Sequence, residues 1–289
     1  MSDQDAVEFK LYRYDPSAGA AAVFCVLFLV ASTIHTYQLV RTRTWFFIPF
    51  VLGGFFEVFG YMGRIESANQ TPNWTTGPYI QQTLLLLIAP TLFAASVYME
   101  LGRIIILTNG EEHSLVPRKW LTKIFLIGDI TSFFMQGAGG GIMASGNIQS
   151  LHTGEKIIIG GLVVQLLFFA LFIFTTLKFH FGLKNNPNRK VLTQRPPWER
   201  HIQALYGGSL LILIRSIFRL IEYAQGNAGY LVSHEAYMYI FDGSLMFLTM
   251  VVFLFIHPSE VNALLNPAAA GKAVRRVFSV YALDQFRPN

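Results

Sequence analysis

Charged side chains interrupt a part of the chain that is otherwise strongly apolar. Positions 210–226 read LLILIRSIFRLIEYAQG, and this run contains Arg215, Arg219 and Glu222. Their spacing of four and then three residues places all three on one face of a helix. An arginine near the centre of a membrane helix costs roughly 2.5–3.5 kcal/mol, whereas each large apolar residue contributes about 0.3–0.6 kcal/mol in favour. The helix is therefore predicted to turn this face toward partners inside the protein.

Three other apolar segments each carry two polar residues seven positions apart. The pairs are Glu57 and Arg64, Asp129 and Gln136, and Glu235 and Asp242. Polar stripes of this kind face the interior of a membrane bundle. At about 1.5 Å per residue, five members are predicted within roughly 9 Å of the bilayer midplane. They are Glu57, Asp129, Arg215, Arg219 and Asp242, and the outer rim holds Arg64, Glu222 and Glu235.

The predicted stripes carry more acid than base. The deep group has three acids against two arginines, and the whole set has five acids against three arginines. Purely structural ion pairs would fix helix register, but such pairs should balance. An excess of buried acid either holds a proton or awaits a cation. We therefore predict a pathway for a substrate or protons, and Asp129 is the acid expected to alternate between them, because its face adds Gln136 and no basic residue.

The elements that must position these side chains are membrane helices. Of the 289 residues, 53% are hydrophobic and 13% are charged, about half the charged fraction of a soluble domain. The apolar residues form blocks of about 20, the length of a membrane-crossing helix, and helices satisfy their own backbone in lipid. We predict an all-α integral membrane protein, a bundle of seven transmembrane helices. The blocks are Ala18–Val40, Trp45–Met62, Tyr79–Leu101, Leu121–Met143, Lys156–Leu177, Gln203–Tyr223 and Glu235–Ile256.

Basic residues predict the orientation of this bundle. Lys and Arg gather in alternate loops, above all in 178–200 and in the tail with Lys272, Arg275 and Arg276. The positive-inside rule then places the N-terminus outside and the C-terminus in the cytosol. The predicted parts are an extracellular tail (1–17), the membrane domain (18–257) and a cytosolic basic tail (258–289). Apolar residues in this last tail have helical spacing and could form an amphipathic helix on the membrane surface: Val274, Val277, Phe278 and Tyr281.

Two glycosylation sequons agree with this orientation. Asn69 and Asn73 each stand two residues before a threonine, in the loop between the second and third predicted helices. That loop is predicted to lie outside, so both asparagines are candidates for glycosylation. The single cysteine, Cys25, lies in the first predicted helix and excludes an intramolecular disulfide.

Several weaker patterns leave alternatives open. The glycine-rich run 136–141 could unwind its helix beside a cavity or pack closely against a neighbour. Glu100 and Arg103 have the spacing of a local salt bridge. The histidines of the predicted cytosolic half lack the spacing of a zinc motif, and they are His35, His180, His201 and His257. The chain has no Walker A loop either, so direct coupling to ATP is not expected. We predict no metal, no cofactor, no nucleic-acid partner and no enzyme activity.

Several segments together resemble a known family. They are GYMGR (60–64), APTLFAASVYMELGR (89–103), DITSFFMQGAGGG (129–141), RSIFRLIEYAQG (215–226) and HEAYMYIFD (234–242), followed by HP at 257–258. These segments resemble the fungal RTA-like proteins, also called the lipid-translocating exporter family. The resemblance implies a seven-helix protein of the plasma membrane or an endomembrane. It further implies export of sphingoid long-chain bases, resistance to amphiphilic toxicants or porphyrin handling, without a catalytic mechanism that could be transferred.

The favoured hypothesis is a transporter or flippase-like exporter of amphipathic lipids or small molecules, in which the polar stripes guide a headgroup while its tail stays in the bilayer. A seven-helix lipid-sensing receptor is the alternative, and an intramembrane lipid hydrolase is disfavoured by the histidine spacing. The plasma membrane is the favoured location. The excess of acid favours a cationic or zwitterionic substrate, such as a sphingoid base with a free amine.

Overall fold

Every predicted apolar block forms a helix. The structure is a computed structural model that describes residues 12–143, 148–194, 196–226 and 229–265. The long helices are α1 (Ala18–Thr42), α2 (Ile48–Asn69), α3 (Thr76–Thr108), α4 (Arg118–Met143), α5 (Ile148–Asn185) and α7 (Trp198–Ala224). The last pass consists of α8 (Glu235–Met238), the π-helical turn η3 (Tyr239–Gly243) and α9 (Ser244–Phe255). Short elements are η1 (Trp45–Phe47), η2 (Glu111–His113), α6 (Arg189–Gln194) and α10 (Ser259–Leu265), and the described ranges contain no strand.

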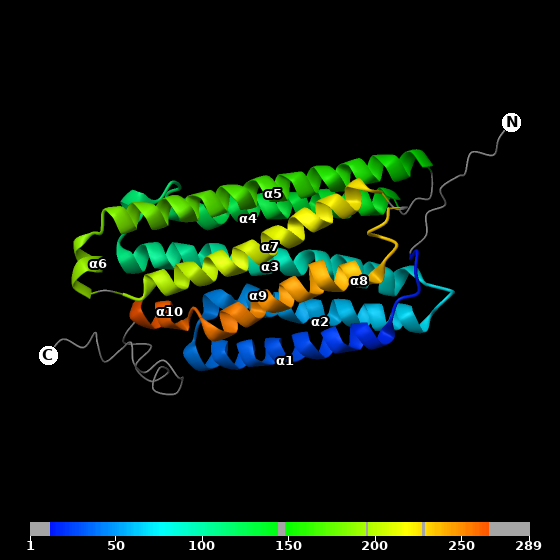
Figure 1. The fold of residues 1–289 in the computed structure, drawn as a ribbon, viewed down its shortest axis with the longest axis horizontal. Coiled ribbons are helices and arrows are strands. Elements are labelled where there is room, and N and C mark those ends of the chain that lie inside the picture. The colour runs from blue at the N-terminus through cyan, green and yellow to red at the C-terminus, as the bar shows by residue number, and fades with distance from the viewer. Residues whose placement is uncertain (1–11, 144–147, 195, 227–228, 266–289) are drawn as a thin grey trace.

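The long helices lie side by side and alternate in direction (Figure 1). One end of the bundle carries the start of α1 and the connections from α2 to α3 and from α7 to α8. We call it the sequon end, because Asn69 and Asn73 lie there. The opposite end carries α6 and α10, and we call it the α10 end. The alternation places Glu235, Arg64 and the end of α7 together at the sequon end.

Six helical segments are long and apolar enough to cross a membrane. They are Ala18–Thr42, Trp45–Asn69, Thr76–Thr108, His152–Asn185, Trp198–Ala224 and Glu235–Leu265. Large apolar side chains also face outward, for example Phe134 at 67% and Leu167 at 65% exposure, while Arg64 and Arg215 are buried. Apolar surface outside and charge inside is the arrangement of a protein that lies in lipid. The protein is an integral membrane protein.

The remaining long helix, α4, contains no stretch as apolar as those of the other six. It has 26 residues, which at about 1.5 Å per residue is long enough to cross a bilayer. Glycines, Asp129 and Gln136 lower its mean hydropathy, so by length and composition six helices qualify as membrane spans and the predicted seventh does not. In Figure 1, α4 runs beside α5 along the bundle.

Close packing explains one residue of the glycine-rich run. The helix α4 continues through Met143, so the run is helical and not unwound. A Cβ atom added at Gly139 would lie 2.7 Å from the carbonyl oxygen of Gly154 and 2.7 Å from a side-chain carbon of Ile158, both on α5. By contrast, a Cβ at Gly137 would meet no atom within 4 Å. The predicted alternative of small-residue packing is therefore the one observed at Gly139.

The segment after the last membrane pass begins with a helix. Residues 258–289 were predicted to be a tail, and within them α10 packs against α3 and α1, with Val261 fully buried. The amphipathic helix predicted around 274–281 lies outside the described residues. The helix α5 also extends beyond its predicted block at both ends, over 38 residues in total.

Candidate functional site

Two polar stripes face each other in antiparallel fashion. On α2 the order toward the sequon end is Glu57, Tyr61 and Arg64, whereas the last pass runs away from that end through Glu235, Tyr239 and Asp242. The two stripes therefore pair in three layers, which we call the outer, tyrosine and deep layers. The outer layer is Arg64 with Glu235, the tyrosine layer is Tyr61 with Tyr239, and the deep layer is Glu57 with Asp242. We call the three layers together the polar column.

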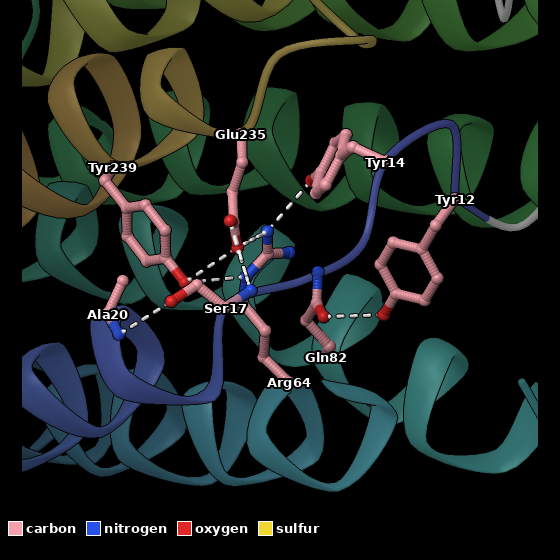
Figure 2. A network of polar contacts seen from close by, with 8 residues as sticks. All are labelled: Tyr12, Tyr14, Ser17, Ala20, Arg64, Gln82, Glu235 and Tyr239. Atoms are coloured by element: carbon pink, nitrogen blue, oxygen red, sulfur yellow. Dashed lines mark hydrogen bonds and ion pairs between the residues drawn. The ribbon is translucent and has the colours of Figure 1, made fainter. Parts of the chain in front are cut away.

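The outer layer is an ion pair between a buried arginine and a partly buried glutamate, with aromatic side chains around it (Figure 2). The Nη2 atom of Arg64 lies 2.7 Å from Oε1 of Glu235, and Arg64 is fully buried. Its Nε–H donates to the hydroxyl oxygen of Tyr239 at 2.9 Å, and Nη2 also donates to that of Tyr14 at 2.8 Å. The guanidinium further lies over both rings, with 5.5 Å to the centroid of Tyr14 and 5.2 Å to that of Tyr239. Hydrogen bonds and cation–π contacts together satisfy most of this buried charge.

The segment before α1 covers the outer layer. The backbone N–H of Ser17 donates to both carboxylate oxygens of Glu235, at 2.9 and 3.1 Å, and the Ser17 hydroxyl oxygen accepts from the N–H of Ala20 as the N-cap of α1. The buried Tyr12 donates its hydroxyl to Oε1 of Gln82 on α3 at 2.9 Å. Figure 2 shows this segment passing over Arg64 and Glu235. It joins α1, α2, α3 and α8 at the sequon end.

The tyrosine layer connects the outer and deep layers. The rings of Tyr61 and Tyr239 have centroids 6.1 Å apart, and Phe24 of α1 stacks on both, at 5.5 and 5.1 Å. Tyr61 is fully buried, and its hydroxyl has no hydrogen-bond partner among the described residues. The hydroxyl lies against Gly243, where a Cβ atom would clash with it. A glycine at this position therefore lets the hydroxyl lie between the layers.

The deep layer holds both arginines of α7 on one carboxylate. The Nε–H of Arg215 donates to Oδ1 of Asp242 at 2.6 Å, and Nη2 of Arg219 donates to Oδ2. Arg215 also donates from Nη2 to the carbonyl oxygen of Leu86 on α3 at 3.0 Å. Arg219 donates from Nη1 to Glu222 at 2.9 Å. Arg215, Asp242 and Glu222 are buried, so α3, α7 and η3 meet around a charged centre.

The π-helical turn explains how Asp242 reaches both arginines. A π turn inserts an extra residue into a helix and occurs often at functional sites. Here the turn spans Tyr239–Gly243, so it includes the tyrosine-layer residue and the deep acid. The sequence contained no signal for this turn, because the segment reads as an ordinary apolar helix.

Glu57 completes the deep layer without an arginine contact of its own. It is 1% exposed, and its Oε1 atom has no hydrogen-bond partner among the described residues. Its charged neighbours are Asp242, Arg215 and Arg219, which interact with it through space. Counting Glu222, the deep layer and its partners contain three acids and two arginines. The excess of acid predicted from the sequence thus persists in this cluster, although Asp129 is not part of it.

Asp129 and Gln136 lie in a different interface. Oδ2 of Asp129 accepts from the Tyr98 hydroxyl of α3 at 2.8 Å, and Tyr98 packs against Phe125, Phe169 and Phe172. The amide of Gln136 donates to the Ser132 hydroxyl at 2.6 Å and to Gln165 of α5 at 3.3 Å. Both residues are buried, as predicted, but they join α4 to α3 and α5. The structure brings the other seven predicted site residues together and leaves these two apart.

A second buried polar cluster lies toward the α10 end and was missed. His201 of α7 lies 3.2 Å from Glu100 of α3 through Nδ1 and 3.2 Å from Glu260 of α10 through Nε2. Glu100 and Arg103 do not form the predicted local salt bridge, since Arg103 donates to Asn262 at 3.0 Å. That prediction was wrong because both partners come from other helices, His201 of α7 for Glu100 and Asn262 of α10 for Arg103, and α10 was predicted as part of a tail. The cluster takes one residue from each of three helices, so no spacing within a single helix could have predicted it.

Metal ligation receives no support from the described residues, which contain no group of three or more His, Cys, Asp or Glu side chains able to hold an ion. Two of the histidines do approach each other, with the rings of His35 and His257 6.0 Å apart. Asn69, at the end of α2, and Asn73 in the following loop are exposed, as glycosylation would require.

A buried charged column inside a lipid-facing bundle defines an integral membrane protein with a polar interior. The chain belongs to the RTA1-like protein family, whose model matches residues 50–263. It is 36% identical to Protein RTA1 of Saccharomyces cerevisiae, over 86% of this chain and 85% of the relative. It is also 36% identical to protoporphyrin uptake protein 1 of the same yeast, over 88% of this chain and 93% of the relative.

A more distant relative is the sphingoid long-chain base transporter RSB1 of Saccharomyces cerevisiae, 28% identical over 81% of this chain and 69% of the relative. No solved structure matches this chain. The predicted family resemblance is confirmed, and relatives with transport-related names agree with a transporter-like membrane protein.

Proposed function

We propose that the protein moves amphipathic lipids or similar small molecules between the two leaflets of its membrane, as a flippase-like exporter. Two relatives are named for transport or uptake of amphipathic compounds, a sphingoid base in one and protoporphyrin in the other. The polar column reaches from the sequon end to the charged centre between α2, α7 and η3. A headgroup would follow this column while its acyl chain stays in the surrounding lipid.

The orientation belongs to this proposal. With α4 as a seventh span, the sequon end lies outside and the α10 end in the cytosol. The positive-inside rule supports this placement, because the basic loop 178–200 lies at the α10 end. The plasma membrane is the proposed location, since the pathway would then open to the outer leaflet.

The observation that carries the proposed substrate class is the acid in excess at the charged centre. Two arginines, Arg215 and Arg219, face three acids, and one of these, Glu57, has no arginine contact. An uncompensated charge in a dry interior is strongly unfavourable. A cationic headgroup would compensate it, whereas an anionic one would add to the excess. We therefore propose a cationic or zwitterionic amphiphile, such as a long-chain amine.

The proposed energy source is not ATP. The sequence has no Walker A loop, and nothing else in it suggests direct use of ATP. Movement would then follow the gradient of the substrate itself, or be coupled to protons. Coupling to protons requires a site that exchanges one cation for another, and the carboxyl group of Glu57, whose Oε1 atom has no partner among the described residues, has the chemistry for it.

The test is lipid flux in proteoliposomes that contain the purified protein. We expect faster transfer of a fluorescent sphingoid base than in protein-free vesicles, and little acceleration of an anionic lipid of equal chain length. Equal transfer of the two lipids would contradict the substrate class. No acceleration of either would leave the receptor alternative, since a lipid-sensing receptor binds its ligand without moving it.

A further inference from the structure

Glu57 differs from the other acids of the column in its contacts. Asp242 binds two arginines, Glu222 binds Arg219 and Glu235 binds Arg64. Glu57 is as deeply buried as Asp242, yet among the described residues its Oε1 atom has no hydrogen-bond partner. A buried carboxyl group without partners is rare in folded proteins, and each instance calls for an explanation.

The group next to Glu57 is unpartnered as well. Tyr61 lies one helical turn nearer the sequon end, and its buried hydroxyl has no partner among the described residues. Tyr239 stacks beside it and donates to Glu235 at 3.2 Å. Carboxyl and hydroxyl groups thus follow one another from Glu57 to the outer layer, and among the described residues no hydrogen bond of Tyr61 competes for the carboxyl group of Glu57.

The charged groups around Glu57 come from few elements. Arg215 and Arg219 face it from α7 and Asp242 from η3, and Tyr61 is its neighbour on α2. From α1, Cys25 packs on the following residue, Val58, at 3.8 Å from its carbonyl oxygen. The charged residues of α1 and α3 lie toward the α10 end of both helices, and they are His35, Arg41, Glu100 and Arg103.

We propose that Glu57 is the cation-exchange residue of the column, which holds a proton when the site is empty and a substrate ammonium group when it is filled. This inference rests on the proposed transport function. Asp242 cannot fill this role, because two arginines occupy both of its oxygens. Glu57 is within reach of the same charged centre and is the acid in excess there.

The exchange balances in charge and in atoms. The neutral carboxyl group of Glu57 releases one proton and becomes a carboxylate, and one ammonium group takes the place of that proton. The proton leaves to the side of the membrane from which the ammonium group arrives, and Glu57 takes up a new proton from the other side when the ammonium group is released there. No covalent bond of the substrate forms or breaks. The net charge of the site is the same in both states, which lets a buried site alternate between them.

The first experiment tests whether Glu57 is protonated and requires no transport. Dicyclohexylcarbodiimide reacts with protonated carboxyl groups in apolar surroundings, and mass spectrometry of the full-length purified protein locates the adduct. We expect an adduct on Glu57 but not on Asp242, and its suppression by N-trimethylsphingosine but not by an alkyl phosphate of equal length. An unmodified Glu57, or a modification that the amine does not suppress, would overturn the inference.

The second experiment follows protons during transport. The quaternary ammonium group of N-trimethylsphingosine has a permanent charge and no proton to lose. Protons that cross the membrane in the opposite direction must therefore be exchanged by the protein. We expect counter-movement of protons in wild type and a loss of about tenfold or more in amine flux for Glu57→Gln, the effect of one charge-assisted contact. Glu57→Asp should retain part of the flux, and Glu66→Gln, an exposed acid on the same helix, should retain all of it.

The two experiments separate the two proposals. If wild type moves no amine, the proposed function fails, and the labelling result still decides whether Glu57 holds an exchangeable proton. If wild type moves the amine and Glu57→Gln does so at the same rate and with the same pH profile, the function stands and the role of Glu57 is excluded. Equal melting temperatures of Glu57→Gln and wild type would show that a loss of flux is not a loss of fold.

Discussion

The Nε atom of Arg215 lies 2.6 Å from Oδ1 of Asp242, and this ion pair joins α7 to the π-helical turn η3. Both side chains are almost fully buried, at 1% and 3% exposure. Arg219 binds the second oxygen of the same carboxylate, so Asp242 is the centre of the charged network. Both oxygens of this carboxylate are bound by arginines, which is why the exchange role is proposed for Glu57 and not for Asp242.

The first prediction concerns the coupling of this pair. Removing one partner of a buried ion pair leaves the other uncompensated, at a cost of about 3–5 kcal/mol. We expect Arg215→Ala and Asp242→Ala each to lower the melting temperature of the purified protein markedly. The double variant should recover part of the loss, because the uncompensated charge is then removed. Arg219→Ala, which leaves Arg215 in place, should give a smaller loss than Asp242→Ala.

Glu66→Ala is the control for these variants, because Glu66 is an exposed acid on α2 and its removal should change stability little. Strict additivity of the Arg215 and Asp242 effects would show that the two residues are not energetic partners.

The second prediction concerns the packing of α4 on α5. A side chain at Gly139 would overlap the carbonyl oxygen of Gly154, whereas one at Gly137 would enter open space. Overpacking costs typically about 1–3 kcal/mol, so Gly139→Leu should lower the melting temperature, while Gly137→Leu, two residues away on the same helix, should leave it near the wild-type value. Similar losses for both variants would show that the glycine-rich run needs flexibility rather than close contact.

Much of this architecture follows from single-helix arguments. The cost of burying arginine in lipid predicts that the α7 stripe turns inward, and helical spacing predicts which residues share a stripe. Spacing within one helix does not say which neighbour its stripe will face. Asp129 was predicted as the exchanging acid because its stripe adds no basic residue, whereas Glu57 shares its stripe with Arg64, yet only Glu57 faces the arginines of α7.

Other features depend on contacts that no local pattern encodes. Residues of the π turn at Tyr239–Gly243 contact the two arginines and Tyr61, which come from other helices. The partners of Glu100 and Arg103 come from α7 and α10, and α10 has only seven residues, too few to be predicted as a membrane helix.

The third prediction concerns orientation. In a Cys25→Ser background, a single cysteine at Gln70 should react with a membrane-impermeant maleimide on intact cells, and one at Asn186 should react only after permeabilisation. Gln70 lies at the sequon end and Asn186, an exposed residue, follows α5 at the other end. Glycosidase-sensitive mass that disappears in an Asn69→Gln, Asn73→Gln variant would support the same orientation independently. The reverse labelling pattern would place the polar column on the cytosolic side.

The fourth prediction compares the two deep acids. Sequence spacing favoured Asp129 as the acid that exchanges a proton for substrate, and the contacts of the structure favour Glu57. Asp129→Asn keeps the size of the side chain and can still accept the hydrogen bond of Tyr98. A neutral amide is also less costly to bury than a charge, so we expect the variant to fold and to melt near the wild-type temperature.

Its effect on transport should be small, because Asp129 joins α4 to α3 and contacts neither Arg215 nor Arg219 in the described structure. We expect the sphingoid-base flux of Asp129→Asn to remain close to wild type with an unchanged pH profile, while Glu57→Gln loses both the flux and its pH dependence. The measurement is flux at several external pH values in proteoliposomes with equal protein content. A larger loss for Asp129→Asn than for Glu57→Gln would move the exchange site from the polar column to the interface between α3 and α4.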